Sequence, residues 1–202
     1  SDTTFLKSLP KREIICGYAE ILKHSLIMNK NFFTYLEKNA ENILKLKKPF
    51  LEKAIFQSCL IKKKIIEKDE REKNIRQILN FGHTFAHAFE ATNNYLKKLN
   101  HGEAVLLGII CAVNFAYQNN NIKKNDYKKI IHHYRKLNLP MNVKKFFSGK
   151  NIKKILSFMK KDKKNNNSNI NLVLLNKIGS VNFNCQFTDS KINRFLKIEL
   201  VN

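Results

Sequence analysis

Hydrophobic side chains recur three and four residues apart along most of this 202-residue chain, a spacing that predicts amphipathic α-helices. The stretches 14–36 and 44–66 both follow it, the second with a break at Pro49. After a polar turn the period resumes at Ile75 and continues to Phe89, so we expect one further helix there. Its polar positions share one face of that helix. They are Arg76, Asn80, His83, His87 and Glu90.

The second half of the chain predicts four more helices. Residues 101–116 are apolar nearly all round, which is typical of a buried helix that begins at His101. Two shorter, basic helices are expected at 126–137, starting at the N-cap Asp126, and at 152–159. A last helix extends to about residue 200. The caps available to it are Asp189 and Ser190.

One β-hairpin is expected near Ile170 to Phe187, because two apolar runs there are separated by a segment that contains Gly179. A chain of 202 residues with 43% hydrophobic content and fifteen Phe can bury one proper core. The sequence therefore predicts a mostly α fold with one small β-hairpin, in which residues 1–202 form a single domain.

The formal net charge of +22 raises the question of a polyanionic partner such as nucleic acid. Lysine is scattered along the whole chain, whereas arginine, the residue best suited to bidentate phosphate contacts, occurs at only five positions. This dispersion is typical of solvated helix faces. We therefore do not expect nucleic acid to be a partner, although a basic nucleic-acid-binding protein remains the non-enzymatic alternative.

The chain has no feature that points to secretion or to a membrane. Its four cysteines lie far apart and form no Cys-x-x-Cys pair, which favours a reducing compartment. The first eleven residues lack an apolar signal core, and the longest apolar stretch, 104–113, is far shorter than the ~20 residues that cross a bilayer. We expect a soluble, cytoplasmic protein.

Histidine and glutamate positions suggest a metal site. His83 and His87 form a His-x-x-x-His pair, which on a helix brings both imidazoles toward one point, although such a pair is as often structural. His101 begins a buried helix, and Glu20 lies among apolar residues where a carboxylate needs a cation. That cation is a metal or the nearby Lys23. One Glu with two His is a common catalytic zinc set.

The remaining histidines and cations have weaker signals. His24 could support Glu20, whereas His132 and His133 lie on a Lys-rich helix and are expected to be exposed. Some of the basic side chains would suit an anionic substrate that has a carboxylate or a phosphate, and by the plainer interpretation they are only solvated. They are Lys62, Lys63, Lys64, Arg76, Lys163 and Lys164.

Residues 76–90 read RQILNFGHTFAHAFE and residues 101–105 read HGEAV. This long pattern closely resembles the signature of the dehydroquinate synthases, members of the sugar phosphate cyclase superfamily. The resemblance covers nearly the entire chain, through further motifs that occur in the same order in the family. These are at 5–10, 17–23, 69–72 and 162–164.

The resemblance implies both an architecture and a reaction. In the family an N-terminal α/β domain binds most of NAD, a helical C-terminal domain holds zinc, and the active site lies between them. These 202 residues resemble the second domain only, so the NAD-binding domain is expected to be absent from them. The reaction converts 3-deoxy-D-arabino-heptulosonate 7-phosphate to 3-dehydroquinate in the shikimate pathway, with NAD⁺ and Zn²⁺ or Co²⁺ as cofactors. A homodimer is also implied.

The resemblance also implies residue roles. The metal ligands would be Glu20, His83 and His101, so His87 changes from a ligand to a substrate-binding or proton-relay residue. The catalytic residues would be Lys23, Glu72 and His87. The substrate contacts would be Lys62, Arg76, Asn80, Lys163 and Lys164. The cofactor contacts would be Phe5, Leu6, Lys7 and Ser8. Another sugar phosphate cyclase, acting on a different phosphorylated sugar, remains the alternative, and we expect little activity without an NAD-binding domain.

Overall fold

The computed structural model describes residues 2–96, 98–161 and 169–201. The α-helices are α1 (Lys11–Met28), α2 (Lys30–Leu44), α3 (Phe50–Lys68), α4 (His83–Thr92), α5 (His101–Gln118), α6 (Lys124–Lys136), α7 (Ile152–Lys160) and α8 (Asp189–Leu200). The 3₁₀ helices are η1 (Thr3–Ser8), η2 (Ile75–Asn80), η3 (Val143–Lys145) and η4 (Gly149–Asn151). Strands β1 (Asn169–Lys177) and β2 (Ser180–Thr188) pair antiparallel. The mostly α fold with one hairpin is confirmed.

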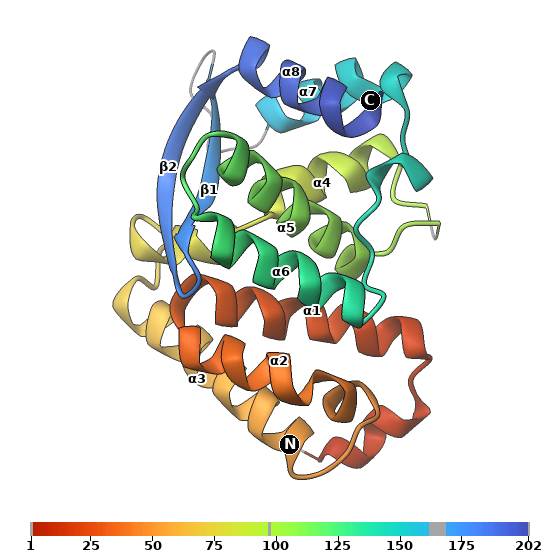
Figure 1. Ribbon diagram of the computed structural model, residues 1–202, viewed down its shortest axis with the longest axis vertical. Helices are drawn as coiled ribbons and strands as arrows, with labels where there is room; N and C mark the ends of the chain where they lie inside the picture. Colours follow the sequence, from red (N-terminus) through yellow and green to blue (C-terminus); the bar gives the residue numbers. More distant parts are fainter. Residues whose placement is uncertain (1, 97, 162–168, 202) are drawn as a thin grey trace.

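Helix α5 lies at the centre of the molecule because it is apolar on nearly every side and almost all of it is buried. Helices α1, α2 and α3 form the lower half of Figure 1, α7 and α8 lie at the top, and the hairpin extends along one side between the two levels. The ring of Phe115 on α5 contacts Phe187 of β2 and Phe195 of α8 edge-on. The hairpin and the last helix thus pack on the same central helix.

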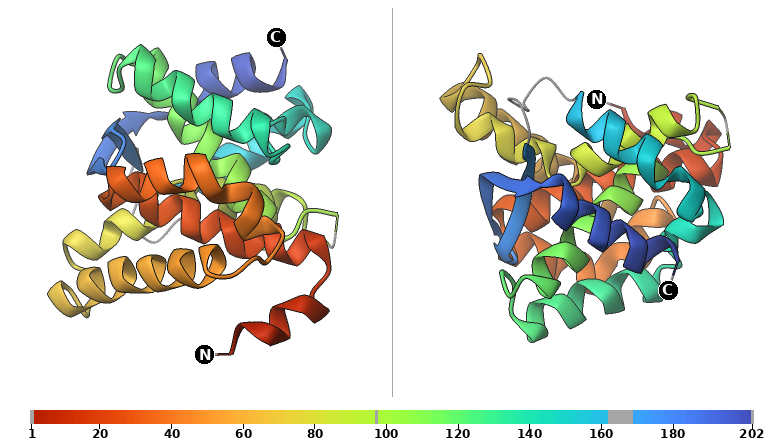
Figure 2. Two further views of the ribbon diagram at one scale, coloured as in Figure 1. Left: turned by 60° about the horizontal axis from the view of Figure 1, so that its bottom comes forward. Right: turned by 90° about the horizontal axis from the view of Figure 1, so that it is seen from above.

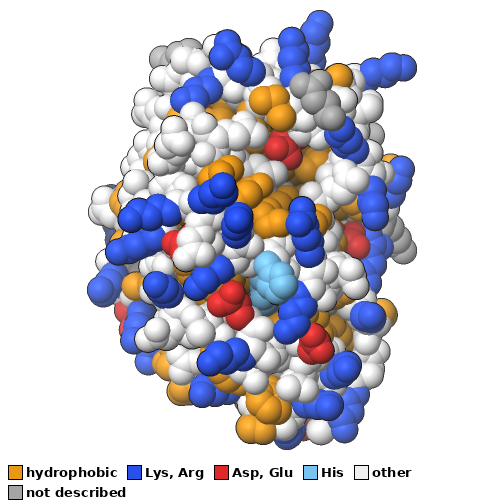
Figure 3. Space-filling model, in the orientation of Figure 1, with side chains coloured by type: hydrophobic (Ala, Val, Ile, Leu, Met, Phe, Trp, Pro, Cys, Tyr) orange, Lys and Arg blue, Asp and Glu red, His pale blue; other side chains and the backbone are white. Residues whose placement is uncertain are grey.

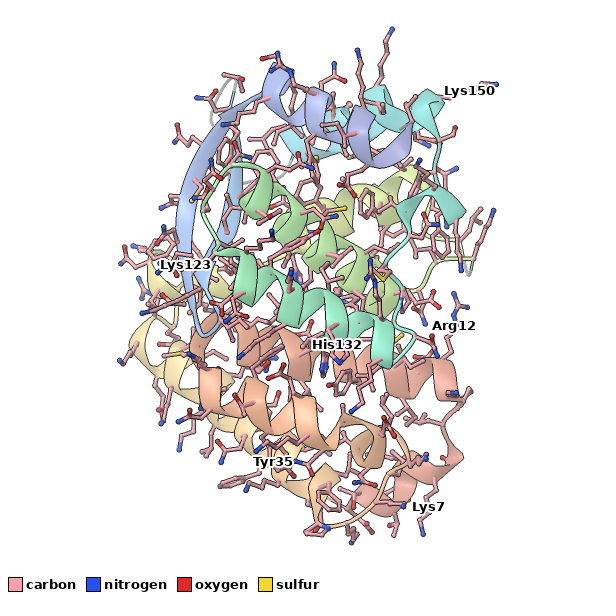
Figure 4. All side chains as sticks on the ribbon, viewed as in Figure 1. Lys7, Arg12, Tyr35, Lys123, His132 and Lys150 are labelled. Atoms are coloured by element: carbon pink, nitrogen blue, oxygen red, sulfur yellow. The ribbon has the colours of Figure 1, made fainter. Side chains whose placement is uncertain are left out.

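Helix α1 crosses closely over the start of α5. A Cβ atom added to Gly102 would lie 2.3 Å from Cys16 Cα, so only glycine fits at this crossing. Arg12 of α1 donates from Nε to Glu103 Oε1 at 2.8 Å and pairs with Oε2 at 2.5 Å. Glu103 and Asn100 also form the capping box of α5. These contacts fix the beginning of α5 against α1, and Figure 4 labels Arg12 at this edge of the fold.

The expectation of one helix from Ile75 to Phe89 is wrong. The chain forms the 3₁₀ helix η2, turns at Gly82 and begins α4 at His83. Gly82 has a φ of +78°, and a Cβ atom there would lie 2.7 Å from Ile109 N of α5. The turn is therefore set by close packing on α5, which the hydrophobic period does not reveal.

The stretch 14–36 is also two helices rather than one, because the chain breaks at Asn29. The Asn29 side chain caps α2 by accepting from Phe32 N at 2.9 Å. The hairpin turn packs against this break, where Gly179 N donates to Leu26 O at 2.7 Å. Asp126 is not the N-cap of α6; its carboxylate instead accepts from Ile178 N at 3.1 Å, which ties the same turn to α6.

Two further expectations about the later helices are corrected. The N-cap of α8 is Thr188, one residue before the predicted caps. His133 is buried, with 2% of its surface exposed, whereas His132 is exposed as expected and is labelled on α6 in Figure 4. His133 lies beside Tyr134 and three residues after Ile130, on the apolar face of α6. Its place on this apolar face decides that it is buried, although the helix as a whole is rich in Lys.

The charged side chains are dispersed over the surface. In Figure 3 Lys and Arg are scattered over the visible face of the molecule, with a few Asp and Glu among them, and do not gather into one patch. Among residues 2–96, 98–161 and 169–201, no helix is long and apolar enough to cross a membrane.

Candidate metal centre and substrate pocket

A polar pocket of about 420 Å³ opens among α1, α3, η2, α4 and α5. It collects side chains from these five helices and from the loop that contains Glu72, and most of them are residues that the sequence singles out. The lining residues are Glu20, Lys23, His24, Lys62, Glu72, Arg76, Leu79, Asn80, His83 and His101. The folding of α1 across α5 therefore brings together positions as far apart in the sequence as Glu20 and His101.

Three of these residues offer a set of metal ligands. One ligand atom each from Glu20, His83 and His101 lies within 4.8 Å of the other two. Glu20 Oε1 is buried, 3.8 Å from His83 Nε2, and accepts no hydrogen bond from the described part of the chain. A buried, unsatisfied carboxylate oxygen beside two imidazoles is the donor chemistry of a catalytic zinc site. These residues fit a bound metal ion.

The two histidines are held through their Nδ1 atoms. His83 Nδ1 lies 3.3 Å from Phe81 O, and His101 Nδ1 lies 3.1 Å from Glu90 Oε1. Nε2 of His101 is thus left for a ligand, and Nε2 of His83 points toward Glu20 Oε1 and Lys23 Nζ, at 3.8 and 3.5 Å. The structure does not group His87 with this set. His87 is exposed one turn along α4, with its ring centroid 5.4 Å from that of His83.

Lys23 lies at the centre of the electrostatics of the pocket. Its ammonium pairs with Glu20 Oε2 at 2.7 Å, so the expected ion pair exists beside the unsatisfied Oε1. Burial raises the pKa of the Glu20 carboxyl, but the charge and hydrogen bond of Lys23, together with His83 and His24, outweigh it, and the pKa is lowered. Burial also lowers the pKa of Lys23, in spite of Glu20.

The pKa values of the pocket histidines shift in opposite directions. Burial and then the nearby Lys23 lower the pKa of His83 to about 3, so this imidazole is neutral at pH 7, the form that binds a metal. The hydrogen bond to Glu90 raises the pKa of His101. His24 is buried, with a pKa lowered to about 4 by burial, and its Nδ1 lies 2.7 Å from Ser58 Oγ.

One rim of the pocket is a loop shaped by Asp69. The buried carboxylate of Asp69 accepts from the backbone N–H groups of Lys73, Asn74 and Arg76 at 2.9, 2.7 and 3.0 Å. In this loop Glu72 adopts a φ of 54°, and its Oε1 accepts from Asn80 Nδ2 at 2.7 Å. In the sequence Asp69 stands out only as the first residue of the motif at 69–72. An acidic residue directly after an amphipathic helix is the signal that could have found it.

The expected cofactor contacts, residues 5–8, lie in η1, outside the polar pocket. Figure 2 shows η1 projecting from the helical bundle, and Phe5 is 76% exposed. Leu6 lines an apolar groove of about 230 Å³ that shares Glu20 with the polar pocket. The expected substrate contacts Lys163 and Lys164 lie outside the described residues.

Comparisons with known proteins agree on one family. Residues 17–165 match the family model described as 3-dehydroquinate synthase C-terminal. The chain is 59% identical over 200 residues to the 3-dehydroquinate synthase of Pelagibacter ubique (strain HTCC1062), covering 99% of this chain and 54% of that protein. It is 40% identical to the enzyme of Endomicrobium trichonymphae, covering 88% of this chain and 48% of that protein. The chain thus spans about half the length of these curated relatives.

Solved structures share the fold at lower identity. One is ValA, a 2-epi-5-epi-valiolone synthase from Streptomyces hygroscopicus subsp. jinggangensis 5008 with NAD⁺ and Zn²⁺ bound, with a TM-score of 0.83, 22% identity, and coverage of 98% of this chain and 54% of that chain. Another is 2-deoxy-scyllo-inosose synthase complexed with carbaglucose-6-phosphate, NAD⁺ and Co²⁺. Its TM-score is 0.77 at 23% identity, and the match covers 98% of this chain and 56% of that chain. The chain belongs to the 3-dehydroquinate synthase family and corresponds to the C-terminal part of its members.

Proposed function

We propose that this chain is the metal- and substrate-binding part of a 3-dehydroquinate synthase, which converts 3-deoxy-D-arabino-heptulosonate 7-phosphate to 3-dehydroquinate and phosphate. The observation that carries the proposal is the group of Glu20, His83 and His101 at the wall of a cation-lined pocket. The 59% identity to a 3-dehydroquinate synthase over nearly the whole chain favours this reaction over that of a sister cyclase.

The metal would be Zn²⁺ or Co²⁺, held by the Glu20 carboxylate and the Nε2 atoms of His83 and His101. When bound, the metal supplies Lewis acidity at a substrate oxygen, and NAD⁺ supplies the hydride chemistry. The titles of two solved relatives support this choice, since one contains NAD⁺ with Zn²⁺ and the other NAD⁺ with Co²⁺.

The cations of the pocket would bind the two anionic groups of the substrate. Lys23, Lys62 and Arg76 come from α1, α3 and η2 and line the same cavity as the metal group. A phosphate and a carboxylate at opposite ends of one sugar acid need such separated cations. Their role is to fix the substrate in one orientation, which can supply much of the rate of a reaction. Lys163 and Lys164, which lie outside the described residues, are proposed as further substrate contacts.

Proton movement would involve Lys23, Glu72 and His87. Burial lowers the pKa of Lys23, so its Nζ releases a proton more readily than a solvated lysine does. Glu72 Oε1 accepts from Asn80, which orients both side chains along the pocket wall. His87, one turn from His83 and exposed, is the residue proposed to pass a proton between the site and solvent.

Activity would require an NAD-binding α/β domain, and the active form is proposed to be a homodimer. The exposed η1, which contains Phe5, Leu6, Lys7 and Ser8, is the proposed cofactor side of this part. The chain spans about half of its relatives, so the partner domain is expected to match the other half.

The test is a complementation assay. The zinc-loaded chain is mixed with the N-terminal half of the Pelagibacter relative, NAD⁺ and the heptulosonate phosphate, and phosphate release is measured. We expect little release from the chain alone, clear release from the mixture, and none with Glu20→Ala. Turnover of glucose 6-phosphate in place of the heptulosonate would favour a sister cyclase. Steeply salt-dependent DNA binding without turnover would favour the nucleic-acid-binding alternative.

A further inference from the structure

Glu90 contacts a proposed metal ligand without being a member of the ligand group. It lies in the last turn of α4, and its carboxylate oxygens are 3.1 and 3.2 Å from Nδ1 of His101. Its side chain is only 13% exposed, whereas that of His101 is 58% exposed. A largely buried carboxylate therefore holds the more exposed of the two imidazoles.

The two histidines of the group are held by different means. His83 is mostly covered by its surroundings, and the partner of its Nδ1 is a backbone carbonyl, that of Phe81. His101, at the exposed first residue of α5, has less packing to restrict rotation of its ring. A charged acceptor at Nδ1 compensates for this, because it keeps the hydrogen on Nδ1, leaves the lone pair on Nε2, and makes that lone pair more basic.

We propose that Glu90 is a positioning residue of the metal centre, which directs Nε2 of His101 toward Glu20 and His83 and strengthens it as a ligand. The proposal rests on the proposed function, because it assumes that the three residues hold a metal. The approach of the His83 and His101 rings, with centroids 5.9 Å apart at 71°, fits this orientation. The negative charge of Glu90 also compensates part of the charge of a bound dication.

The first experiment measures Zn²⁺ affinity of the full chain by competition with a chromophoric chelator. We expect the Kd to rise about tenfold in Glu90→Gln, which keeps the shape and loses the charge, and toward about a hundredfold in Glu90→Ala. Glu41→Gln is the matched control, because this exposed carboxylate on α2 lies outside the pocket and also has a single cationic partner, Lys136 at 3.6 Å. Its Kd should equal that of the wild type.

A double variant separates positioning from a general structural role. If Glu90 acts through His101, adding Glu90→Gln to His101→Ala leaves the already weakened Kd unchanged. In the zinc-loaded wild type, ¹⁵N NMR of the histidines should give a protected Nδ1–H signal for His101, and this signal should exchange rapidly in Glu90→Gln. Because Glu90→Gln preserves side-chain volume, it decides the question even if Glu90→Ala fails to fold.

A Kd within twofold of the wild type in Glu90→Gln would overturn the inference, and so would a full additive loss in the His101→Ala background. Both results leave the zinc site itself intact. A wild-type chain that binds no Zn²⁺ would instead overturn the proposed function, and with it the premise on which this inference depends.

Discussion

Helix α1 presents two polar clusters on nearly opposite faces, since Tyr18 and Glu20 are two residues apart. The first cluster is closed. The Tyr18 hydroxyl lies 2.7 Å from Nε2 of His133, both side chains are buried, and the His133 ring also contacts Phe33. The second cluster, around Glu20 and His83, is open, because both residues line the polar pocket and Glu20 Oε1 is buried without a hydrogen bond from the described residues.

Burial alone does not separate the two clusters. Both contain a histidine that burial keeps neutral at pH 7, with a pKa lowered to about 3 for His83 and to about 4 for His133. The difference lies in whether the remaining lone pairs find partners within the fold. A buried polar group whose partners are all protein atoms stabilises structure, whereas one with an unmet lone pair beside a cavity marks a ligand site.

The largest effect is expected from removing a proposed ligand of the open cluster. Glu20→Ala should weaken Zn²⁺ binding by about two to three orders of magnitude, because one of three protein ligands is lost. Tyr18→Phe, two residues away, should leave the affinity unchanged while removing a buried hydrogen bond. Zinc content after dialysis against a graded chelator series measures both variants. Equal losses of zinc in the two variants would erase the distinction between the clusters.

The second expected effect is on the crossing of α1 and α5, which holds Glu20 of the open cluster close to His101. Gly102→Ala places a Cβ atom 2.3 Å from Cys16 Cα, and the resulting shift should cost about 3 kcal/mol of stability. It should also weaken zinc binding, because it moves Glu20 relative to His101. Gly17→Ala is the control, since nothing lies within 4 Å of its added Cβ and alanine favours the helix. Urea unfolding compares them, and equal midpoints would contradict the close crossing.

Hydrophobic period predicts most of the fold. It locates the helices at 101–116 and 152–159 and the hairpin to within one or two residues of their observed bounds. It fails where the chain turns for a tertiary reason. At Asn29 and Gly82 the apolar spacing continues through a break that the hairpin turn and α5 impose. Local spacing contains no information about which distant segment approaches the backbone.

The candidate site follows from sequence only in part. Spacing alone pairs His83 with His87, while the structure groups His83 with His101 and Glu20, because α4 ends and the chain returns before α5 begins. The resemblance to a family supplied that grouping. It did not indicate that Glu90 contacts His101, since this contact between α4 and the start of α5 depends on the path of the intervening loop.

The third expected effect is a pH dependence that belongs to the closed cluster. The folded-state pKa of His133 is about 4, below the value near 6.5 of an unfolded chain, so between these values the unfolded state binds more protons. The free energy of unfolding therefore falls as the pH drops through this window, by about 2 kcal/mol from pH 7 to pH 5. His133→Gln should remove that part of the slope in urea titrations.

His132 provides the control for this measurement. It neighbours His133 on α6 but is exposed, so His132→Gln should leave the slope as it is in the wild type. Equal slopes in the wild type and His133→Gln would mean that the buried histidine does not contribute to the pH dependence.

The smallest effect is expected in the loop at the rim of the open cluster, which Asp69 holds in place. The Asp69 carboxylate accepts three backbone N–H groups, and they outweigh its burial and lower its pKa. Asp69→Asn removes the charge and one acceptor, so the amides of Lys73 and Asn74 should exchange with solvent roughly tenfold faster. Zinc affinity should stay constant, because no ligand lies in this loop. Glu70→Gln, at an exposed neighbouring residue, is the control and should leave the exchange rates unchanged. A zinc affinity that falls with Asp69→Asn would mean that the rim and the metal group form one cooperative unit.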